Sequence, residues 1–103
     1  MKNIAILGST GSIGQQALEV IDNNPDRFAV EVLTANNNVD LLIEQAKKFH
    51  PNAVVIANEE KYDFVRSALA GEDIKVYILN NWFKFYINSI FQANTNGFDH
   101  ISI

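Results

Sequence analysis

Near its amino terminus the chain reads Asn3-Ile4-Ala5-Ile6-Leu7-Gly8-Ser9-Thr10-Gly11-Ser12-Ile13-Gly14. Residues 3–7 form a short, nearly continuous apolar run, which is typical of a strand buried on both faces in a parallel sheet. From Ser12 the pattern becomes helical, because apolar residues recur at spacings of three and four. The helix is expected to end at residues 22–25, where proline cannot continue it. Its apolar positions are Ile13, Ala17, Val20 and Ile21.

The glycines of this stretch each suit a different task in a phosphate-binding loop. Gly8 lets the chain turn sharply out of the strand, Gly11 leaves room for a pyrophosphate beside the backbone, and Gly14 lets the helix pack closely on the strand. The helix N-terminus offers unpaired N–H groups and a partial positive charge to a phosphate. Thr10 and Ser12 add hydroxyl donors, and Ser12 is also a candidate helix cap. The loop therefore predicts a dinucleotide site; a strand–helix turn that binds no ligand is the alternative.

The remaining patterns up to residue 79 alternate between strands and helices. Strands are expected over residues 28–35, 53–57 and 75–79, and helices over residues 39–49 and 59–70. Asn38 is a candidate N-cap of the first of these helices, and Gly71 suits the position just after the second. Such alternation predicts a parallel sheet with right-handed crossovers. The fold class is therefore α/β, a Rossmann-like doubly wound parallel sheet that is incomplete, with about four strands and three helices. The apolar stripes of the two helices are Val39, Leu42, Ile43, Ala46 and Phe49, and Tyr62, Val65 and Leu69.

Residues 80–103 differ in composition from the rest of the chain. They hold six of the eleven aromatic residues, and their only charged residues are Lys84 and Asp99. We therefore expect a partial dinucleotide-binding domain over residues 1–79 and an atypical tail over residues 80–103. A short helix is expected over residues 82–91, packed on the face or edge of the sheet. The abrupt change of composition leads us to expect a truncated chain with a foreign or frame-shifted tail.

The turn after the second expected strand bears on the choice of dinucleotide. Domains that bind NAD usually carry Asp or Glu there, which holds the ribose 2′-hydroxyl. This chain has Asn36, Asn37 and Asn38 instead. A carboxylate would repel a 2′-phosphate whereas amides can donate to it, so the turn favours NADP over NAD. The alternative is an asparagine-rich turn that only caps the next helix, and the two interpretations are compatible.

Composition and charge exclude several classes of function. The net charge of −4 argues against a nucleic-acid partner, which normally requires a basic patch. Without cysteine the chain has no disulfide, thiolate metal site or cysteine nucleophile. No apolar run approaches the roughly 18 residues of a membrane span, so a cytoplasmic protein without membrane contact is expected. His50 and His100 lack other ligands at a suitable spacing, so we expect neither a metal site nor a catalytic residue in this chain.

Several segments together resemble the 1-deoxy-D-xylulose 5-phosphate reductoisomerase family. The resemblance covers about residues 1–79, and its glycine loop is more specific than a bare glycine triplet. It implies an NADPH-dependent enzyme of non-mevalonate isoprenoid biosynthesis that converts 1-deoxy-D-xylulose 5-phosphate to 2-C-methyl-D-erythritol 4-phosphate. A divalent metal, Mg²⁺ or Mn²⁺, and a homodimer are implied for the complete enzyme. The segments that carry the resemblance are residues 6–14, 18–21, 24–25, 28–30 and 33–39, with Leu42, Gln45, Phe49 and Pro51.

The resemblance also implies which residues contact the cofactor. They are Thr10, Gly11, Ser12 and Ile13 in the glycine loop, and Asn36, Asn37 and Asn38 in the asparagine turn. Asn36 stands where the family usually has glycine. The family's Ala-Asn-Lys-Glu segment, acidic metal site and substrate phosphate site do not occur in this sequence. The resemblance thus implies the NADPH-binding part of the enzyme, inactive by itself.

Two other functions are alternatives to the NADPH-binding part of this enzyme. A non-catalytic dinucleotide-binding module, or an inactive fragment, would show the same glycine loop and would hold the cofactor without chemistry. A short-chain dehydrogenase would need a Tyr-x-x-x-Lys pair for proton transfer, and the chain contains no such pair. The first alternative stays open at the level of sequence, and the second is excluded.

Overall fold

The computed structural model describes residues 2–79 and 100–102. Each expected strand and helix of the first 79 residues is present, with ends that shift by a few residues. A 3₁₀ helix precedes the third α-helix. The elements are, in chain order, β1 (Lys2–Ile6), α1 (Ser12–Asp22), β2 (Phe28–Ala35), α2 (Val39–Phe49), β3 (Ala53–Ile56), η1 (Glu59–Lys61), α3 (Tyr62–Ala68), β4 (Lys75–Ile78) and β5 (His100–Ser102).

The strands form one parallel sheet in the order β4-β3-β2-β1-β5. Successive strands from β1 to β4 are added in one direction, and β5 pairs with the other side of β1, in register from Ile4 opposite His100. The order therefore reverses at β1. Such a reversal defines the switch point of a doubly wound sheet, outside whose carboxyl ends ligands bind. About four strands were expected, and the additional strand β5 comes from within the atypical tail.

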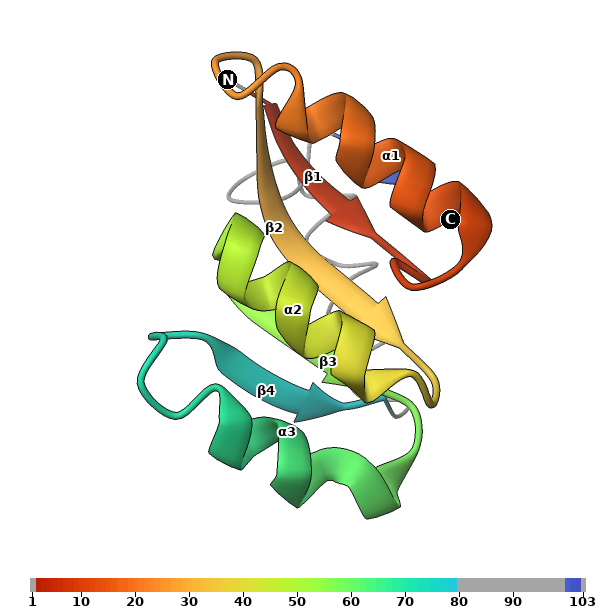
Figure 1. Cartoon of the computed structure of the whole chain (residues 1–103), viewed down its shortest axis with the longest axis vertical. Helices are drawn as coiled ribbons and strands as arrows, with labels where there is room; N and C mark the ends of the chain where they lie inside the picture. The colour runs from red at the N-terminus through yellow and green to blue at the C-terminus, as the bar shows by residue number, and fades with distance from the viewer. Residues whose placement is uncertain (1, 80–99, 103) are drawn as a thin grey trace.

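All three α-helices cover one face of the sheet, as right-handed crossovers in one direction require. Figure 1 shows α1 and α2 lying across this face. Side chains from all three helices join alternate strand residues such as Ile6, Leu33 and Ile56 in the main core. The intervening strand residues form a smaller core on the second face, which none of the α-helices described here covers. It consists of Ala5, Val32, Ala53 and Val55, with Tyr77 packed against them.

Helix α1 buries only part of its apolar pattern. Ile13 and Val20, two of its four predicted apolar positions, are 65% and 55% exposed. The buried positions are Gly14, Leu18 and Ile21. The spacing of four and three residues is helical, and the buried face begins at Gly14, which faces the loop after β1. A hydrophobic pattern does not count glycine, so it does not show that the first turn of the helix is buried through Gly14.

The third helical segment also departs from expectation. Residues 59–70 were predicted as one helix, but Asn58 caps a separate 3₁₀ turn through its side chain, which accepts from the N–H of Glu60 at 3.1 Å. Gly71 does not take the left-handed position expected of it; the non-glycine residue Asp73 does so, with φ of 54°. The helix predicted over residues 82–91 lies outside the described residues.

Gly14 determines how closely α1 approaches the loop after β1. A Cβ atom built at this position would lie 2.3 Å from the carbonyl oxygen of Gly8 and 2.6 Å from the Cα of Ser9. Both neighbours are backbone atoms, which cannot rotate away. Gly8 itself has φ of 79°, so the turn out of β1 uses a conformation that side chains rarely adopt. The structural tasks that the sequence predicted for these two glycines are thus confirmed.

Substitutions along α1 should distinguish its buried face from its exposed face. Leu18→Ala should lower the free energy of unfolding by about 2–4 kcal/mol, because Leu18 is buried in the main core. Val20→Ala should change it by no more than about 0.5 kcal/mol, because Val20 is largely exposed. Urea denaturation followed by circular dichroism measures both values. Equal losses for the two variants would contradict this orientation of the helix.

Alanine substitutions at three glycines should differ in their effect on stability. Gly14→Ala should cost about 3 kcal/mol, because its methyl group would overlap backbone. Gly8→Ala should cost about 1–2 kcal/mol, since it meets no neighbour but has a left-handed φ. Gly71→Ala is the control: it has open space and no left-handed φ, so it should be neutral or stabilising by up to about 1 kcal/mol. Thermal denaturation tests this order, and a Gly14→Ala variant as stable as Gly71→Ala would refute it.

Candidate dinucleotide site

The glycine loop and the asparagine turn lie at the same edge of the sheet. The loop follows the carboxyl end of β1 and the turn follows the carboxyl end of β2, which pairs with β1 in parallel. Figure 1 shows both connections on the right of the view, where the two arrows end. Because the strand order reverses at β1, the loop stands at the switch point of the sheet. The fold therefore brings together the two segments that the sequence analysis singled out.

Thr34 on β2 holds the beginning of the glycine loop. Its hydroxyl accepts a hydrogen bond from the N–H of Gly8 at 2.8 Å, and its carbonyl accepts one from the N–H of Ser9 at 2.9 Å. The Ser9 hydroxyl also reaches this carbonyl, at 3.3 Å. Ser9 is fully buried, so it is a structural residue of the loop and is not available to a ligand. The role of Thr34 was not foreseen, because nothing local in the sequence links it to Gly8.

The second half of the loop leads into α1 without a side-chain cap. Gly11 occupies the N-cap position, and no side chain hydrogen bonds to the cap. The expectation that Ser12 caps the helix is therefore wrong: Ser12 is the first residue of the helix itself. Gly11 donates to the carbonyl of Gly8 at 3.1 Å and accepts from the N–H of Gln15 at 2.9 Å. The Gln15 side chain donates to the Thr10 carbonyl at 2.9 Å, which fixes the other side of the turn.

Four backbone donors remain free after these bonds are formed, and three of them belong to residues that are not buried. Among residues 2–79 and 100–102, the N–H groups of Thr10, Ser12 and Ile13 have no hydrogen-bond acceptor. Ser12 and Ile13 are exposed, and Thr10 is half-buried. Free N–H groups at the start of an eleven-residue helix carry a partial positive charge and are suited to bind an anion. The loop can therefore hold a phosphate group without any cationic side chain.

The asparagine turn caps α2 and keeps donors exposed. The Asn38 side chain accepts from the N–H of Leu41 at 3.3 Å, which confirms the predicted N-cap. The Asn37 side-chain oxygen accepts from the Asn58 amide at 2.8 Å, and the Asn36 carbonyl accepts from the Asn58 N–H at 3.2 Å. All three turn asparagines are exposed. Because the bonded side-chain atoms of Asn37 and Asn38 are oxygens, their amide nitrogens remain available as donors.

A hollow of about 240 Å³ connects the loop with the turn. Gly8 and Asn36 both line it, and Thr34 forms part of the wall between them. Small or apolar side chains form the rest of its surface, which suits a flat, partly apolar group better than a charged one. The hollow is lined by Leu7, Gly8, Thr34, Ala35, Asn36, Val55, Ala57 and Leu79.

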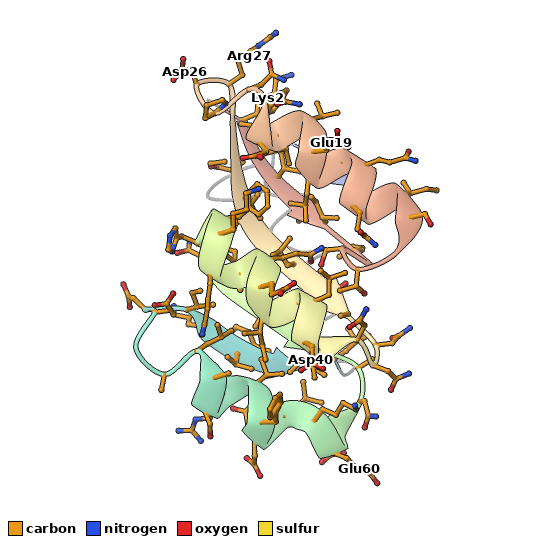
Figure 2. The ribbon with its side chains drawn as sticks, viewed as in Figure 1. Lys2, Glu19, Asp26, Arg27, Asp40 and Glu60 are labelled. Atoms are coloured by element: carbon orange, nitrogen blue, oxygen red, sulfur yellow. The ribbon has the colours of Figure 1, made fainter. Side chains whose placement is uncertain are left out.

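Charged side chains are distributed unevenly between the two edges of the sheet. Figure 2 shows Lys2 and Arg27 together with Asp26 at the amino edge, whereas Asp40 and Glu60 lie at the edge of the asparagine turn. Within the described part of the chain, no three His, Asp or Glu side chains gather closely enough to hold a metal ion. None of the described helices is long and apolar enough to span a membrane. The donors described at this site are backbone N–H groups, hydroxyls and asparagine amides, all of which are uncharged.

Comparison with known proteins identifies the family. The sequence model of the 1-deoxy-D-xylulose 5-phosphate reductoisomerase family matches residues 4–84. The reductoisomerase of Phocaeicola vulgatus is 66% identical over 76 residues, and that of Porphyromonas gingivalis is 63% identical over the same length. In both cases the match covers 74% of this chain and 20% of the relative. The chain thus spans about a fifth of the length of the curated relatives that it matches.

Solved structures show the same relationship. The reductoisomerase of Zymomonas mobilis in complex with NADPH superposes with a TM-score of 0.78 at 33% identity, over 97% of this chain and 24% of that one. A reductoisomerase in complex with NADPH, fosmidomycin and magnesium superposes with a TM-score of 0.80 at 28% identity, over 98% of this chain and 24% of that one. The fold, the glycine loop and the family match agree: this chain belongs to the 1-deoxy-D-xylulose 5-phosphate reductoisomerase family.

Proposed function

We propose that this chain is the NADPH-binding part of a 1-deoxy-D-xylulose 5-phosphate reductoisomerase. The observation that carries the proposal is the set of free N–H groups of Thr10, Ser12 and Ile13 at the switch point of the sheet. Asn36 lies across the adjoining hollow from this loop. One end of the site thus suits a pyrophosphate and the other end suits an adenosine ribose.

Thr10, Gly11, Ser12 and Ile13 would hold the pyrophosphate. The N–H groups of Thr10, Ser12 and Ile13 are free to donate to its oxygens, and Thr10 and Ser12 add hydroxyl donors. Gly11 contributes by the absence of a side chain, because its Cα is exposed where the anion would approach. The exposed Ile13 side chain supplies apolar surface that a bound dinucleotide can cover. Such a contact would account for the exposure of Ile13, which does not pack in the core.

The asparagine turn would hold the 2′-phosphate of the adenosine ribose. The side chain of Asn36 has no partner among the residues described, and it borders the hollow. The amide nitrogens of Asn37 and Asn38 add further donors, because their oxygens are already used. No carboxylate stands within the turn to compete for the ribose or to repel the phosphate. NADPH is therefore proposed in preference to NADH.

The reaction itself would need residues beyond those described here. Bound NADPH supplies a hydride for the reduction of a sugar phosphate, 1-deoxy-D-xylulose 5-phosphate. The described residues do not form a metal site, so a divalent metal such as Mg²⁺ or Mn²⁺ would be held by other parts of a complete enzyme. Structures of relatives contain magnesium and fosmidomycin. The complete enzyme is proposed to be a cytoplasmic homodimer that binds neither nucleic acid nor membrane, in keeping with the net charge of −4.

Titration of NADPH into the chain, followed by nicotinamide fluorescence, tests the proposal directly. The chain should bind NADPH without converting the sugar phosphate. Gly11→Ala should keep the fold, because the new Cβ meets only the Gly8 carbonyl at 3.5 Å. Its methyl group would stand in the path of the pyrophosphate, so the dissociation constant should rise about tenfold or more. Gly71→Ala is the matched control, and a Gly11→Ala chain that binds as tightly as this control would contradict the assignment.

A carboxylate placed in the asparagine turn should reverse the preference between cofactors. Asn36→Asp should weaken NADPH binding about tenfold, because it replaces a donor with a negative charge beside the 2′-phosphate. Binding of NADH should stay equal or improve, since the new carboxylate can accept from the ribose 2′-hydroxyl. Asn23→Asp makes the same change of charge at the far end of α1 and should alter neither affinity. Equal losses for both cofactors would show that the turn does not contact the 2′-phosphate.

A further inference from the structure

Gln45 places a polar side chain inside the apolar face of α2. It is only 7% exposed and lies among buried residues of the helix that include Leu42 and Ala46. Its amide nitrogen donates to the main-chain carbonyl of Ser9 at 2.9 Å, across 36 residues of sequence. Its side-chain oxygen is buried and has no partner among the described residues. A buried amide with an unsatisfied oxygen is unfavourable for folding by itself, so its position calls for another explanation.

The Ser9 carbonyl that Gln45 contacts belongs to the peptide bond between Ser9 and Thr10. This peptide is trans, as are all described peptides of the chain. In a trans peptide the C=O and the following N–H point in opposite directions. Because the Ser9 carbonyl points inward to Gln45, the N–H of Thr10 must point outward from the protein. That N–H is one of the free donors of the glycine loop.

Ser9 is held from two sides, and each contact has a separate effect. Thr34 accepts from the Ser9 N–H at 2.9 Å and fixes the residue against β2. That bond leaves the next peptide free to rotate about the Ser9 backbone. Only the Gln45 amide bonds to the Ser9 carbonyl among the described residues, so it opposes this rotation. A flipped peptide would present a carbonyl oxygen, in place of an N–H, to an incoming phosphate.

We infer that Gln45 is a positioning residue for cofactor binding, because it orients the Ser9–Thr10 peptide so that the Thr10 N–H faces the pyrophosphate. This inference rests on the proposed function and adds to it a residue that does not touch the cofactor. This role explains why the Gln45 side chain is buried although its oxygen has no partner among the described residues: only its amide nitrogen makes a hydrogen bond. Since both NADPH and NADH carry the pyrophosphate, Gln45 should affect the two affinities equally.

Gln45→Met is the decisive variant. Methionine has a similar length and is a good helix former, but it cannot donate to the Ser9 carbonyl. It removes the unpaired oxygen but also leaves the buried Ser9 carbonyl without its donor, so the two effects oppose each other and the melting temperature should change little. The dissociation constants for NADPH and NADH should both rise about tenfold, the order expected for loss of one well-placed donor to an anion. Gln16→Met, on the exposed side of α1, is the control and should change neither property.

A second measurement reports on the loop without cofactor. In the full chain, the ¹³C resonance of the Ser9 carbonyl should move upfield in Gln45→Met, since a carbonyl that loses a hydrogen bond becomes more shielded. Gln16→Met should leave that resonance in place. A merely structural role would lower the melting temperature and the affinity together, and that result would overturn the inference.

The remaining outcomes separate this inference from the proposed function. If the unmodified chain bound no NADPH, both would fall. If it bound NADPH and Gln45→Met bound as tightly, only the role of Gln45 would fall. If the variant lost affinity for NADPH but not for NADH, its effect would lie at the 2′-phosphate, and the proposed orientation of the Thr10 peptide would be wrong.

Discussion

The contact between Gly14 of α1 and the backbone of Gly8 and Ser9 sets the geometry of the carboxyl edge. With no room for a Cβ atom, the first turn of the helix rests directly on the loop that leaves β1. The first N–H groups of the helix therefore stand immediately beside the loop and not one side chain farther away. Because a helix N-terminus attracts anions only over about one turn, this closeness decides whether loop and helix can act on one phosphate.

The loop is fixed by groups that use its inward-facing atoms and leave the outward-facing ones free. Thr34 takes the N–H groups of Gly8 and Ser9, Gln45 donates to the Ser9 carbonyl, and Gln15 donates to the Thr10 carbonyl. What remains is a set of donors without acceptors. Free donors at an exposed edge cost little free energy, because water can hydrogen bond to them. Their directions are nevertheless fixed before a ligand arrives. Preorganisation of this kind reduces the entropy that binding must overcome.

Much of this fold could be predicted from the sequence because its signals are local. The β2 strand was predicted to the residue, and the cap of α2 at Asn38 was correct, since strand patterns and capping side chains act within a few positions. The errors have an equally physical origin. The apolar pattern that marked α1 as a helix includes Ile13 and Val20, which are exposed, whereas Gly14 occupies the buried position that faces the loop after β1. The separate 3₁₀ turn at Glu59–Lys61 depends on a side-chain cap by Asn58 that competes with a continuous helix.

The site was predictable in its segments but not in its supports. Glycine spacing and the run of asparagines mark Gly8–Gly14 and Asn36–Asn38 without any structure. Thr34 and Gln45 gave no such signal, because each meets the loop across 25 to 36 residues of sequence and through hydrogen bonds that no local pattern marks. Any suitably placed acceptor could replace the Thr34 hydroxyl, and any suitably placed donor could replace the Gln45 amide, so neither role requires one residue type.

The use of neutral donors also follows from the charges of the molecule. The chain carries a net charge of −4, and Asp40 and Glu60 lie at the edge where the asparagine turn stands (Figure 2). Long-range attraction therefore cannot draw an anionic dinucleotide to this edge. Recognition must come from short-range hydrogen bonds, whose strength depends on direction. A displaced peptide would lose these hydrogen bonds. For that reason the buried contacts behind the loop should matter to affinity more than any charge on the surface in front of it.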